Sequence, residues 1–346
     1  MLLAIGIISL FAWQAERPIN EKNGFMRKFV GASLDTMGVM LREKNVTAAI
    51  GATEHQIFFQ TNTPGKLFIT DKHLGNEHYF SFDLVPDKKL SSLFFCAIDS
   101  PVVYVFAANV PAVFTGNLNT KSITRHLLPG TIYTRSAVVS PSNFMFRGFD
   151  KARGASNQVF LKGGLENNII QWENGVSEKH NDGGIITDGL LHYDSLTHLL
   201  AYINFYRNLF LCLDTNLNLV YKGHTIDTFR TVATRNLPGE QRYSGGKPSR
   251  LINWENCVAD GLLYNNSWIK SDNESIDNFK RNSVIDVYRL SDGQYEKSFY
   301  IPAFKGERLY RFWIFGDRII VLYKHYIVAY TLNELFTWEK NYKRIK

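Results

Sequence analysis

The chain has 346 residues, 45% hydrophobic and 14% aromatic, which is enough apolar surface for a core and excludes a largely disordered protein. The formal net charge is +7, but the basic residues are scattered and accompany no nucleic-acid recognition motif, so we expect no nucleic acid as a partner.

Cys96, Cys212 and Cys257 are widely spaced, which excludes a disulfide framework and a paired-cysteine zinc site. We expect buried free thiols, with one disulfide and a leftover thiol as the alternative.

Residues 1–20 contain an apolar run from Leu2 to Ala15. This run is too short to span a bilayer comfortably and has the length of the hydrophobic part of a signal peptide. Two features depart from that pattern, because no Lys or Arg precedes the run and Trp13 stands where a small residue is expected. We interpret the segment as a signal peptide, with an uncleaved anchor or an ordinary buried element as alternatives. We therefore expect an exported protein, periplasmic or extracellular or membrane-anchored, that contacts a membrane only through this segment.

Residues 21–346 are predicted to form a single all-β domain. Beyond residue 45, short apolar runs alternate with turn residues, and segments of helical periodicity are nearly absent. Two strand-like runs recur as a pair six times. The first members are residues 56–59, 102–106, 143–146, 198–202, 261–264 and 318–322. The second members are residues 66–69, 112–114, 158–161, 208–211, 284–288 and 326–330.

A third apolar run often precedes the pair, and a fourth follows several of the pairs. Small polar turns such as Asp99-Ser100-Pro101 and Asp260-Gly261 join the third run to the pair. The unit is therefore four short antiparallel strands, and successive units are 41 to 64 residues apart when measured from residues 57, 102, 143, 198, 262 and 319. Units of this kind predict a β-propeller of six four-stranded blades. A seven-bladed ring and a pair of β-sandwiches are the alternatives.

The two ends of the chain indicate how such a ring closes. The sixth unit completes its third strand near Leu332, and the tail beyond it is short and basic. The candidate for the missing fourth strand is the N-terminal run Phe25–Val30. We therefore predict that this N-terminal strand fastens the ring.

In its four-strand units and their number, the chain resembles six-bladed propellers of the TolB-like and NHL-like kind over about residues 25–335. Ser140-Pro141-Ser142-Asn143-Phe144 is similar to the Ser-Pro-Asp-Gly turn of TolB-type blades, and no WD dipeptide occurs. The resemblance implies a six-bladed ring, and exported proteins are common among such propellers.

No motif of a known catalytic site is present, because the chain lacks GxSxG, HExxH and GxxxxGK[ST] motifs and the acidic spacing of an EF-hand. His180, Asp182, Asp188 and His192 lie within about a dozen residues and are the candidate metal ligands. His180 and Asp182 fit a polar turn, however, and His192 fits a strand. We therefore predict no metal site and no cofactor.

Two basic regions are the candidates for ligand binding. Residues 228–253 form an unusually long connection that is rich in arginine, with Glu240 as its single acid. Arginine presents a planar fork that suits carboxylates and phosphates. The connection is either an anion-binding lid or a solvated insertion. The third unit adds a basic set, of which Arg147 ends a strand where channel loops gather. The candidate ligand-binding residues are Arg135, Arg147, Arg230, Arg235, Arg242 and Tyr243.

The first functional hypothesis is a monomeric, non-enzymatic binding or interaction module. Its ring face is expected to bind a partner protein or an anionic small molecule or polysaccharide. The alternative is a hydrolase or lyase that acts on an anionic carbohydrate at the central channel, so the sequence leaves open whether the protein is an enzyme. Arginines that converge in one pocket favour an anion site, whereas His, Asp, Glu and Arg clustered in the channel favour an enzyme.

Overall fold

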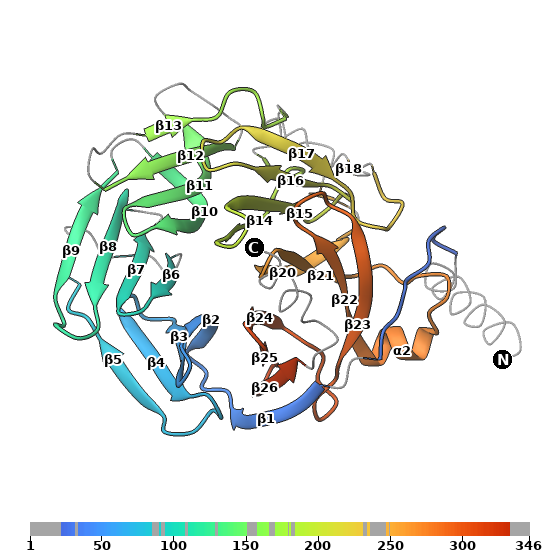
Figure 1. The fold of residues 1–346 in the computed structure, drawn as a ribbon, viewed down its shortest axis with the longest axis horizontal. Coiled ribbons are helices and arrows are strands. Elements are labelled where there is room, and N and C mark those ends of the chain that lie inside the picture. The colour runs from blue at the N-terminus through green and yellow to red at the C-terminus, as the bar shows by residue number, and fades with distance from the viewer. Residues whose placement is uncertain are drawn as a thin grey trace, which may run out of the picture.

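The structure, a computed structural model, contains a ring of six four-stranded antiparallel sheets (Figure 1). This confirms the predicted six-bladed β-propeller. The residues it describes are 22–31, 34–84, 90, 94–107, 110–128, 131–150, 158–165, 170–178, 180, 184–230, 234–235, 247–248 and 250–332. The predicted signal peptide or anchor, residues 1–20, lies outside them. Among the described residues, no helix is long and apolar enough to cross a membrane.

The blades follow one another along the chain, and blade 1 begins at residue 46. Blade 1 consists of β2 (Val46–Ala52), β3 (Gln56–Thr61), β4 (Lys66–Asp71) and β5 (His78–Ser81). Blade 2 consists of β6 (Phe94–Asp99), β7 (Val102–Ala107), β8 (Ala112–Asn117) and β9 (Ile123–Leu127). Blade 3 consists of β10 (Thr131–Ser140), β11 (Asn143–Asp150), β12 (Val159–Gly164) and β13 (Ile170–Trp172).

The other three blades complete the ring. Blade 4 consists of β14 (Gly189–Asp194), β15 (Leu199–Asn204), β16 (Phe210–Leu213) and β17 (Leu219–Gly223). Blade 5 consists of β20 (Asn253–Ala259), β21 (Leu262–Ser267), β22 (Asn282–Arg289) and β23 (Tyr295–Pro302), with α2 (Ile276–Arg281) between β21 and β22. Blade 6 consists of β24 (Arg311–Phe315), β25 (Arg318–Leu322), β26 (Tyr326–Leu332) and the N-terminal β1 (Leu34–Leu41).

Closure of the ring by an N-terminal strand is confirmed, but the predicted residues were wrong. The closing strand is β1, which pairs antiparallel with β26 from Leu34 opposite Leu332 to Leu41 opposite Tyr326. Gly38 lets β1 lie close to the turn after β4, because a Cβ at that position would lie 2.0 Å from the backbone oxygen of His73.

The segment from residue 23 to residue 30 instead runs along the outer strand of blade 5. Backbone hydrogen bonds of 2.9 Å join Val30 N to Ser298 O and Ser298 N to Lys28 O. We call this segment, together with Glu274 and Asp286, the N-terminal clamp.

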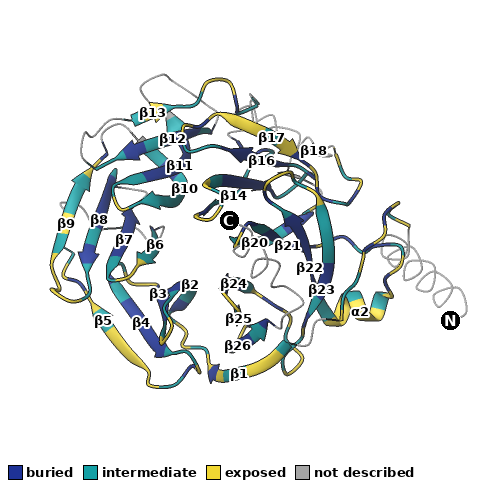
Figure 2. Ribbon diagram, viewed as in Figure 1, coloured by how far each residue is buried: buried dark blue, intermediate teal, exposed yellow. Residues whose placement is uncertain are grey.

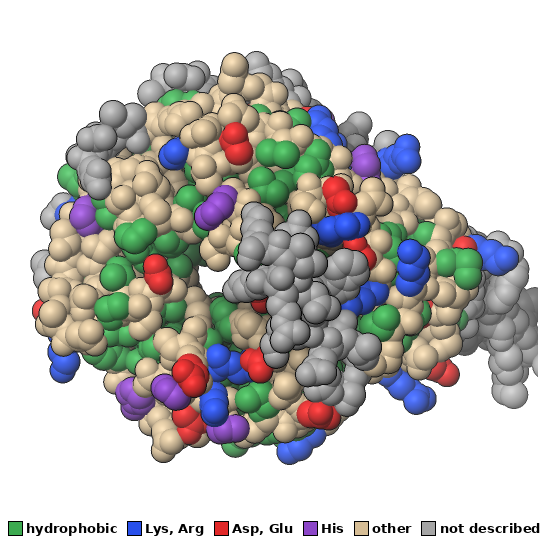
Figure 3. All heavy atoms as spheres, in the orientation of Figure 1, with side chains coloured by type: hydrophobic (Ala, Val, Ile, Leu, Met, Phe, Trp, Pro, Cys, Tyr) green, Lys and Arg blue, Asp and Glu red, His purple; other side chains and the backbone are tan. Residues whose placement is uncertain are grey.

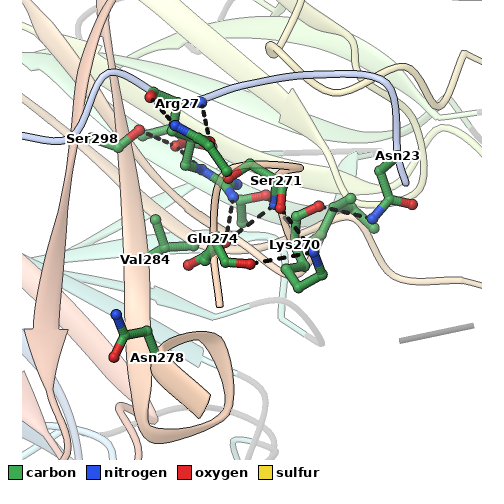
Figure 4. A network of polar contacts seen from close by, with 12 residues as sticks. Asn23, Arg27, Lys270, Ser271, Glu274, Asn278, Val284 and Ser298 are labelled. Atoms are coloured by element: carbon green, nitrogen blue, oxygen red, sulfur yellow. Dashed lines mark hydrogen bonds and ion pairs between the residues drawn. The ribbon is translucent and has the colours of Figure 1, made fainter. Parts of the chain in front are cut away.

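Arg27 holds the clamp in place through two ion pairs in which both partners are buried (Figure 4). Its Nε and Nη2 donate to the two oxygens of Asp286 at 2.7 and 3.0 Å, and its Nη1 donates to Glu274 at 3.0 Å. Burial opposes the charge on Arg27, but Asp286 and Glu274 raise its pKa above the ordinary value. Tyr300 also donates to Glu274 at 2.6 Å, and Ser298 donates to Asp286 at 2.5 Å. The clamp is therefore a paired and hydrogen-bonded network, the condition under which buried charges are tolerated.

The core lies between blades and is built mainly from their middle strands (Figure 2). Between blades 2 and 3, for example, the ring centroids of Phe106 and Phe144 lie 5.3 Å apart in an edge-on contact. Such aromatic pairs add to the stabilisation from apolar burial. The cysteines are free thiols, as predicted; Cys212 and Cys257 are buried and Cys96 is partly buried.

The connections between strands differ on the two faces of the ring. On the hairpin face, first strands connect to second strands and third strands to fourth strands, and the longest such connection is residues 72–77. On the opposite, long-loop face, second strands connect to third strands and each blade connects to the next. The four longest connections belong to this face: residues 82–93, 173–188, 224–252 and 268–281. Because binding residues concentrate on loops that a rigid scaffold positions, the long-loop face is where a site is expected.

Candidate functional site

A small cavity lies between blades 3 and 4 at the long-loop face. Its volume is about 20 Å³, which holds only one or two water-sized groups. Its walls come from the end of β11, the connection between β13 and β14, and the end of β15 with the residues after it. The lining residues are Arg147, Val176, Ser177, Glu178, Thr187, Tyr202, Asn204, Arg207, Leu209 and Leu211.

Strand alternation explains why Arg147 faces this cavity. Phe144 and Phe146 of β11 pack in the cluster between blades 2 and 3. Met145 belongs to the cluster between blades 3 and 4. Because successive side chains of a strand point to opposite faces, Arg147 follows Met145 toward blade 4.

Arg147 is buried but incompletely satisfied. It is 2% exposed, and its guanidinium carbon lies 4.4 Å from the ring centroid of Phe160 and 5.0 Å from that of Tyr202. Its Nη1 donates to the hydroxyl of Ser177, which in turn donates to Glu173. Its Nε has no hydrogen-bond partner, and no carboxylate of the described residues forms an ion pair with it. A buried charge without a direct counterion is costly, and the two ring contacts offset part of that cost.

The other charges of the cavity neutralise each other. Glu178 accepts a hydrogen bond from Arg207 at 2.8 Å and contacts His180 at 3.1 Å. Burial alone would raise the pKa of Glu178, but the bonds with Arg207 and His180 lower it below the ordinary value. Glu178 is therefore ionised and paired with Arg207, so it does not serve as a counterion to Arg147.

Arg135 lies beside Arg147, at the wall of the central channel. The two residues are cross-strand partners in β10 and β11. Arg135 donates to Gly189 O at 2.8 Å and to Asp188 at 3.2 Å, so it joins blade 3 to blade 4. Burial raises the pKa of Asp188, and the positive charge of Arg135 opposes that rise.

Further polar residues lie on the innermost strands β14, β20 and β24, which surround the channel. His192 Nε2 lies 2.8 Å from Asn256 Oδ1, and burial lowers the pKa of His192 to about 4. Glu255 Oε1 lies 3.3 Å from Arg311 Nε. Burial raises the pKa of Glu255 to about 7 against the opposing charges of Arg311 and Arg135. The ring is open at its centre in Figure 3.

The structure brings together two of the sequence-predicted ligand residues, Arg135 and Arg147. Arg230 is exposed on the connection after β17. Arg235 belongs to a short strand, β18 (Thr234–Arg235), that pairs with β19 (Lys247–Pro248), so residues 228–253 contain a two-stranded ribbon. Arg242 and Tyr243 lie outside the described residues, so their predicted role stays a prediction.

The candidate metal ligands have different partners. His180 contacts Glu178, and His192 contacts Asn256. Asp182 lies outside the described residues. Within the part of the chain that is described, no group of three His, Cys, Asp or Glu side chains is arranged to hold a metal ion.

The sequence analysis did not identify the residues that complete the cavity or those that pair on the innermost strands. Ser177 and Glu178 lie in the connection between blades 3 and 4, and Arg207 lies in a turn, so no periodic pattern marks them. Glu255 and Arg311 were detectable as charged residues inside or beside apolar runs that the repeat places on innermost strands. That signal indicates the channel wall but does not identify the pairs.

No family model matches the chain, and no curated protein matches it. Among solved structures, a DUF4221 family member from Bacteroides vulgatus has a TM-score of 0.54 and 12% identity, over 90% of this chain and 99% of that one. Virginiamycin B lyase from Staphylococcus aureus has a TM-score of 0.46 and 10% identity, over 85% and 100%. A chain of a nidogen–laminin complex has a TM-score of 0.45 and 10% identity, over 78% and 92%. At these identities, the similarity to the Bacteroides protein supports the propeller fold alone.

Proposed function

We propose that this propeller is a binding module that holds an anionic group in the cavity between blades 3 and 4. One observation carries the proposal, namely the buried guanidinium of Arg147 with a free Nε and no ion pair among the described residues. A ligand carboxylate or phosphate supplies the missing acceptor and counterion. Charge-assisted hydrogen bonds to arginine are among the strong ones, and arginine binds such groups through two parallel bonds.

The size of the cavity limits what enters it. A volume of about 20 Å³ admits one or two oxygen-sized atoms, so only the oxygen atoms of an acidic group enter, and the rest of the ligand lies toward the long-loop face. Ser177, Tyr202 and Thr187 belong to the same wall, and the hydroxyls of Tyr202 and Thr187 donate to the backbone oxygens of Thr187 and Gly184. The proposed ligand is therefore a small molecule or polymer end that carries a terminal carboxylate or phosphate.

The test is thermal stabilisation by phosphate, sulfate, succinate, citrate and glucuronate, followed by calorimetric titration of the best anion. A ligand at one hundred times its Kd stabilises the folded state by about 2.7 kcal/mol. We expect Arg147→Met to abolish this effect and Arg147→Lys to weaken it. Arg289→Met is the control, because Arg289 lies at the end of β22 on the hairpin face. The proposal fails if no anion binds below 1 mM, or if Arg147→Met binds as the intact protein does.

A second candidate function, hydrolysis or elimination on an anionic carbohydrate, is favoured by the channel wall. Burial raises the pKa of Glu255 to about 7 and lowers that of His192 to about 4. Two titratable groups whose environments shift their pKa values in opposite directions are typical of acid–base sites. In this candidate, Glu255 exchanges a proton with the substrate and Arg311 binds its acidic group.

This candidate is tested by incubating the protein with polygalacturonate, alginate and hyaluronan and measuring new reducing ends and unsaturated products. Activity that is lost in Glu255→Gln and kept in Arg147→Met supports the enzyme. Absence of turnover on all three polymers, or turnover that Glu255→Gln retains, contradicts it.

A further inference from the structure

Three aromatic side chains meet on the long-loop face where blades 5 and 6 adjoin. We call Trp254, Trp268 and Tyr310 the aromatic platform. Trp268 is 48% exposed and Tyr310 is 43% exposed, and partly buried Trp254 contacts both. The ring centroids of Trp254 and Trp268 lie 5.7 Å apart, and Trp254 Nε1 donates to the backbone oxygen of Tyr310 at 3.3 Å.

The platform is fixed by the propeller rather than by a free loop. Trp254 lies at the start of β20, Trp268 directly after β21, and Tyr310 directly before β24. Backbone hydrogen bonds of 2.8 Å join Trp268 N to Ile252 O and Tyr310 N to Leu322 O. Single exposed aromatic residues are common, but a rigid set that spans two blades is typical of a binding surface.

Two guanidinium groups flank the platform. The guanidinium carbons of Arg42 and Arg311 lie 5.1 and 5.7 Å from the ring centroid of Tyr310. Arg311 pairs with Glu255, whereas Arg42 donates to the backbone oxygens of Val46 and Tyr323 and has no carboxylate partner among the described residues. Burial and the positive charge of Arg311 lower the pKa of Arg42. This surface therefore holds two positive charges against one negative charge, and a ligand anion would relieve the repulsion.

From this juxtaposition we propose that the aromatic platform with Arg42, Arg311 and Glu255 binds an acidic saccharide of the uronate class. The apolar C–H face of a sugar ring packs on an aromatic ring, and its hydroxyl groups bond to the Glu255 carboxylate. The uronate carboxylate lies between the two guanidinium groups, whose planar forks suit it.

A single-stranded nucleic acid also stacks on aromatic residues, but the charge here favours the saccharide. Strands of nucleic acid are bound by grooves of positive charge that follow many phosphates. The platform offers one positive charge in excess, and Glu255 would repel a phosphate backbone. The site is separate from the Arg147 cavity, so the inference does not rest on the proposed anion site, although it shares Glu255 and Arg311 with the second candidate function.

The experiment is calorimetric titration of the intact protein with tetragalacturonate, tetramannuronate, a hyaluronan tetrasaccharide, neutral cellotetraose and a thymidine octanucleotide. We expect at least one uronate to bind at least tenfold more tightly than cellotetraose, and this preference to shrink with salt, which screens exposed charges. Trp268→Ala and Tyr310→Ala should each weaken binding by about tenfold, the effect of losing one aromatic stacking contact.

Tyr79→Ala is the matched control, because Tyr79 is 42% exposed but lies on the outermost strand of blade 1. It should bind uronates as the unaltered protein does. Circular dichroism verifies that each variant is folded. The inference is overturned if no uronate binds below 1 mM, if cellotetraose binds equally well, if the octanucleotide alone binds, or if folded Trp268→Ala and Tyr310→Ala retain full affinity.

Discussion

Two arginines of this propeller are buried to the same degree and have opposite surroundings. Arg27 is 3% exposed and Arg147 is 2% exposed. Arg27 donates from three guanidinium nitrogens to two carboxylates of blade 5. Arg147 lies against two aromatic rings and a hydroxyl group, with an unsatisfied Nε and no ion pair among the described residues. Burial alone therefore does not separate a structural arginine from a ligand-binding one.

The difference lies in what the removal of each side chain leaves behind. Without Arg27, two carboxylates stay buried and lose their counterion. Without Arg147, the described part of the chain loses two ring contacts and one hydrogen bond, but no buried carboxylate loses an ion pair. A network in which every charge is paired stabilises the fold. A network with an unpaired charge is a place where a ligand completes the pairing.

The largest effect on stability is expected for Arg27→Met, which tests the difference between the two arginines. We expect a loss of about 3–5 kcal/mol in the free energy of unfolding, because removing one partner leaves the buried charges of Glu274 and Asp286 uncompensated. Urea unfolding measures it, and Met26→Ala is the control, since Met26 is 68% exposed. A loss below about 1 kcal/mol shows that the clamp does not stabilise the ring.

A second, smaller effect concerns His192, which is held neutral at the channel wall. Because its folded-state pKa is about 4, below the ordinary 6.5, the unfolded chain takes up a proton first as the pH falls. Relative to His192→Gln, the unaltered protein should therefore lose up to about 3 kcal/mol between pH 6.5 and pH 4. Urea unfolding at both pH values measures this difference.

Glu255 does not confound that measurement, although its own effect has the opposite sign. Its raised pKa of about 7 contributes stability that is lost as the pH rises from 4.5 to 7. It is present in both proteins, so its contribution largely cancels in the comparison. An unchanged difference between pH 6.5 and pH 4 would contradict the proposed neutral state of His192.

Arg147→Met should cost no more than about 1 kcal/mol. An apolar side chain of similar length avoids the burial of a charge without an ion pair, which offsets the loss of the two ring contacts. The same urea titration measures the effect without added anion. A loss as large as that of Arg27→Met would mean that Arg147 is a structural residue, and the proposed anion site would lose its basis.

The smallest effect is expected for Arg289→Met. Arg289 pairs with Asp292 at 3.2 Å and with Glu296 at 3.0 Å, but its side chain is 42% exposed. Exposed ion pairs contribute little, so we expect a change below about 0.5 kcal/mol. Adding salt should reduce it further. A larger loss would mean that pairing alone, without burial, explains the stability assigned to the Arg27 clamp.

Much of the fold is readable in the sequence because the middle strands of a propeller are buried on both faces and form nearly continuous apolar runs. The predicted runs at residues 102–106 and 318–322 correspond to β7 and β25. The closing strand was harder to identify, because β1 is an outer strand whose residues are mostly half-buried or exposed, so its apolar run Met37–Leu41 does not by itself mark a core position. Phe25–Val30 lies beside blade 5 instead, and Arg27 within it pairs with carboxylates 247 and 259 residues away.

The candidate sites show the same limit. Arg135 and Arg147 were identified from the sequence as members of one basic set in the third unit, and the structure places them opposite each other in one hairpin. Glu178 and Arg207, or Glu255 and Arg311, belong to different elements that only the ring brings together. Nothing in their local sequences indicates these partners.

The sequence by itself determined the strand content, the four-strand unit and the six repeats, because the period of apolar residues along the chain reflects local burial. Only the tertiary structure decided which N-terminal segment closes the ring, which buried arginine has carboxylate partners and which charges meet at the channel. Those features depend on contacts between residues distant in the chain, and they form only when six blades close into a ring.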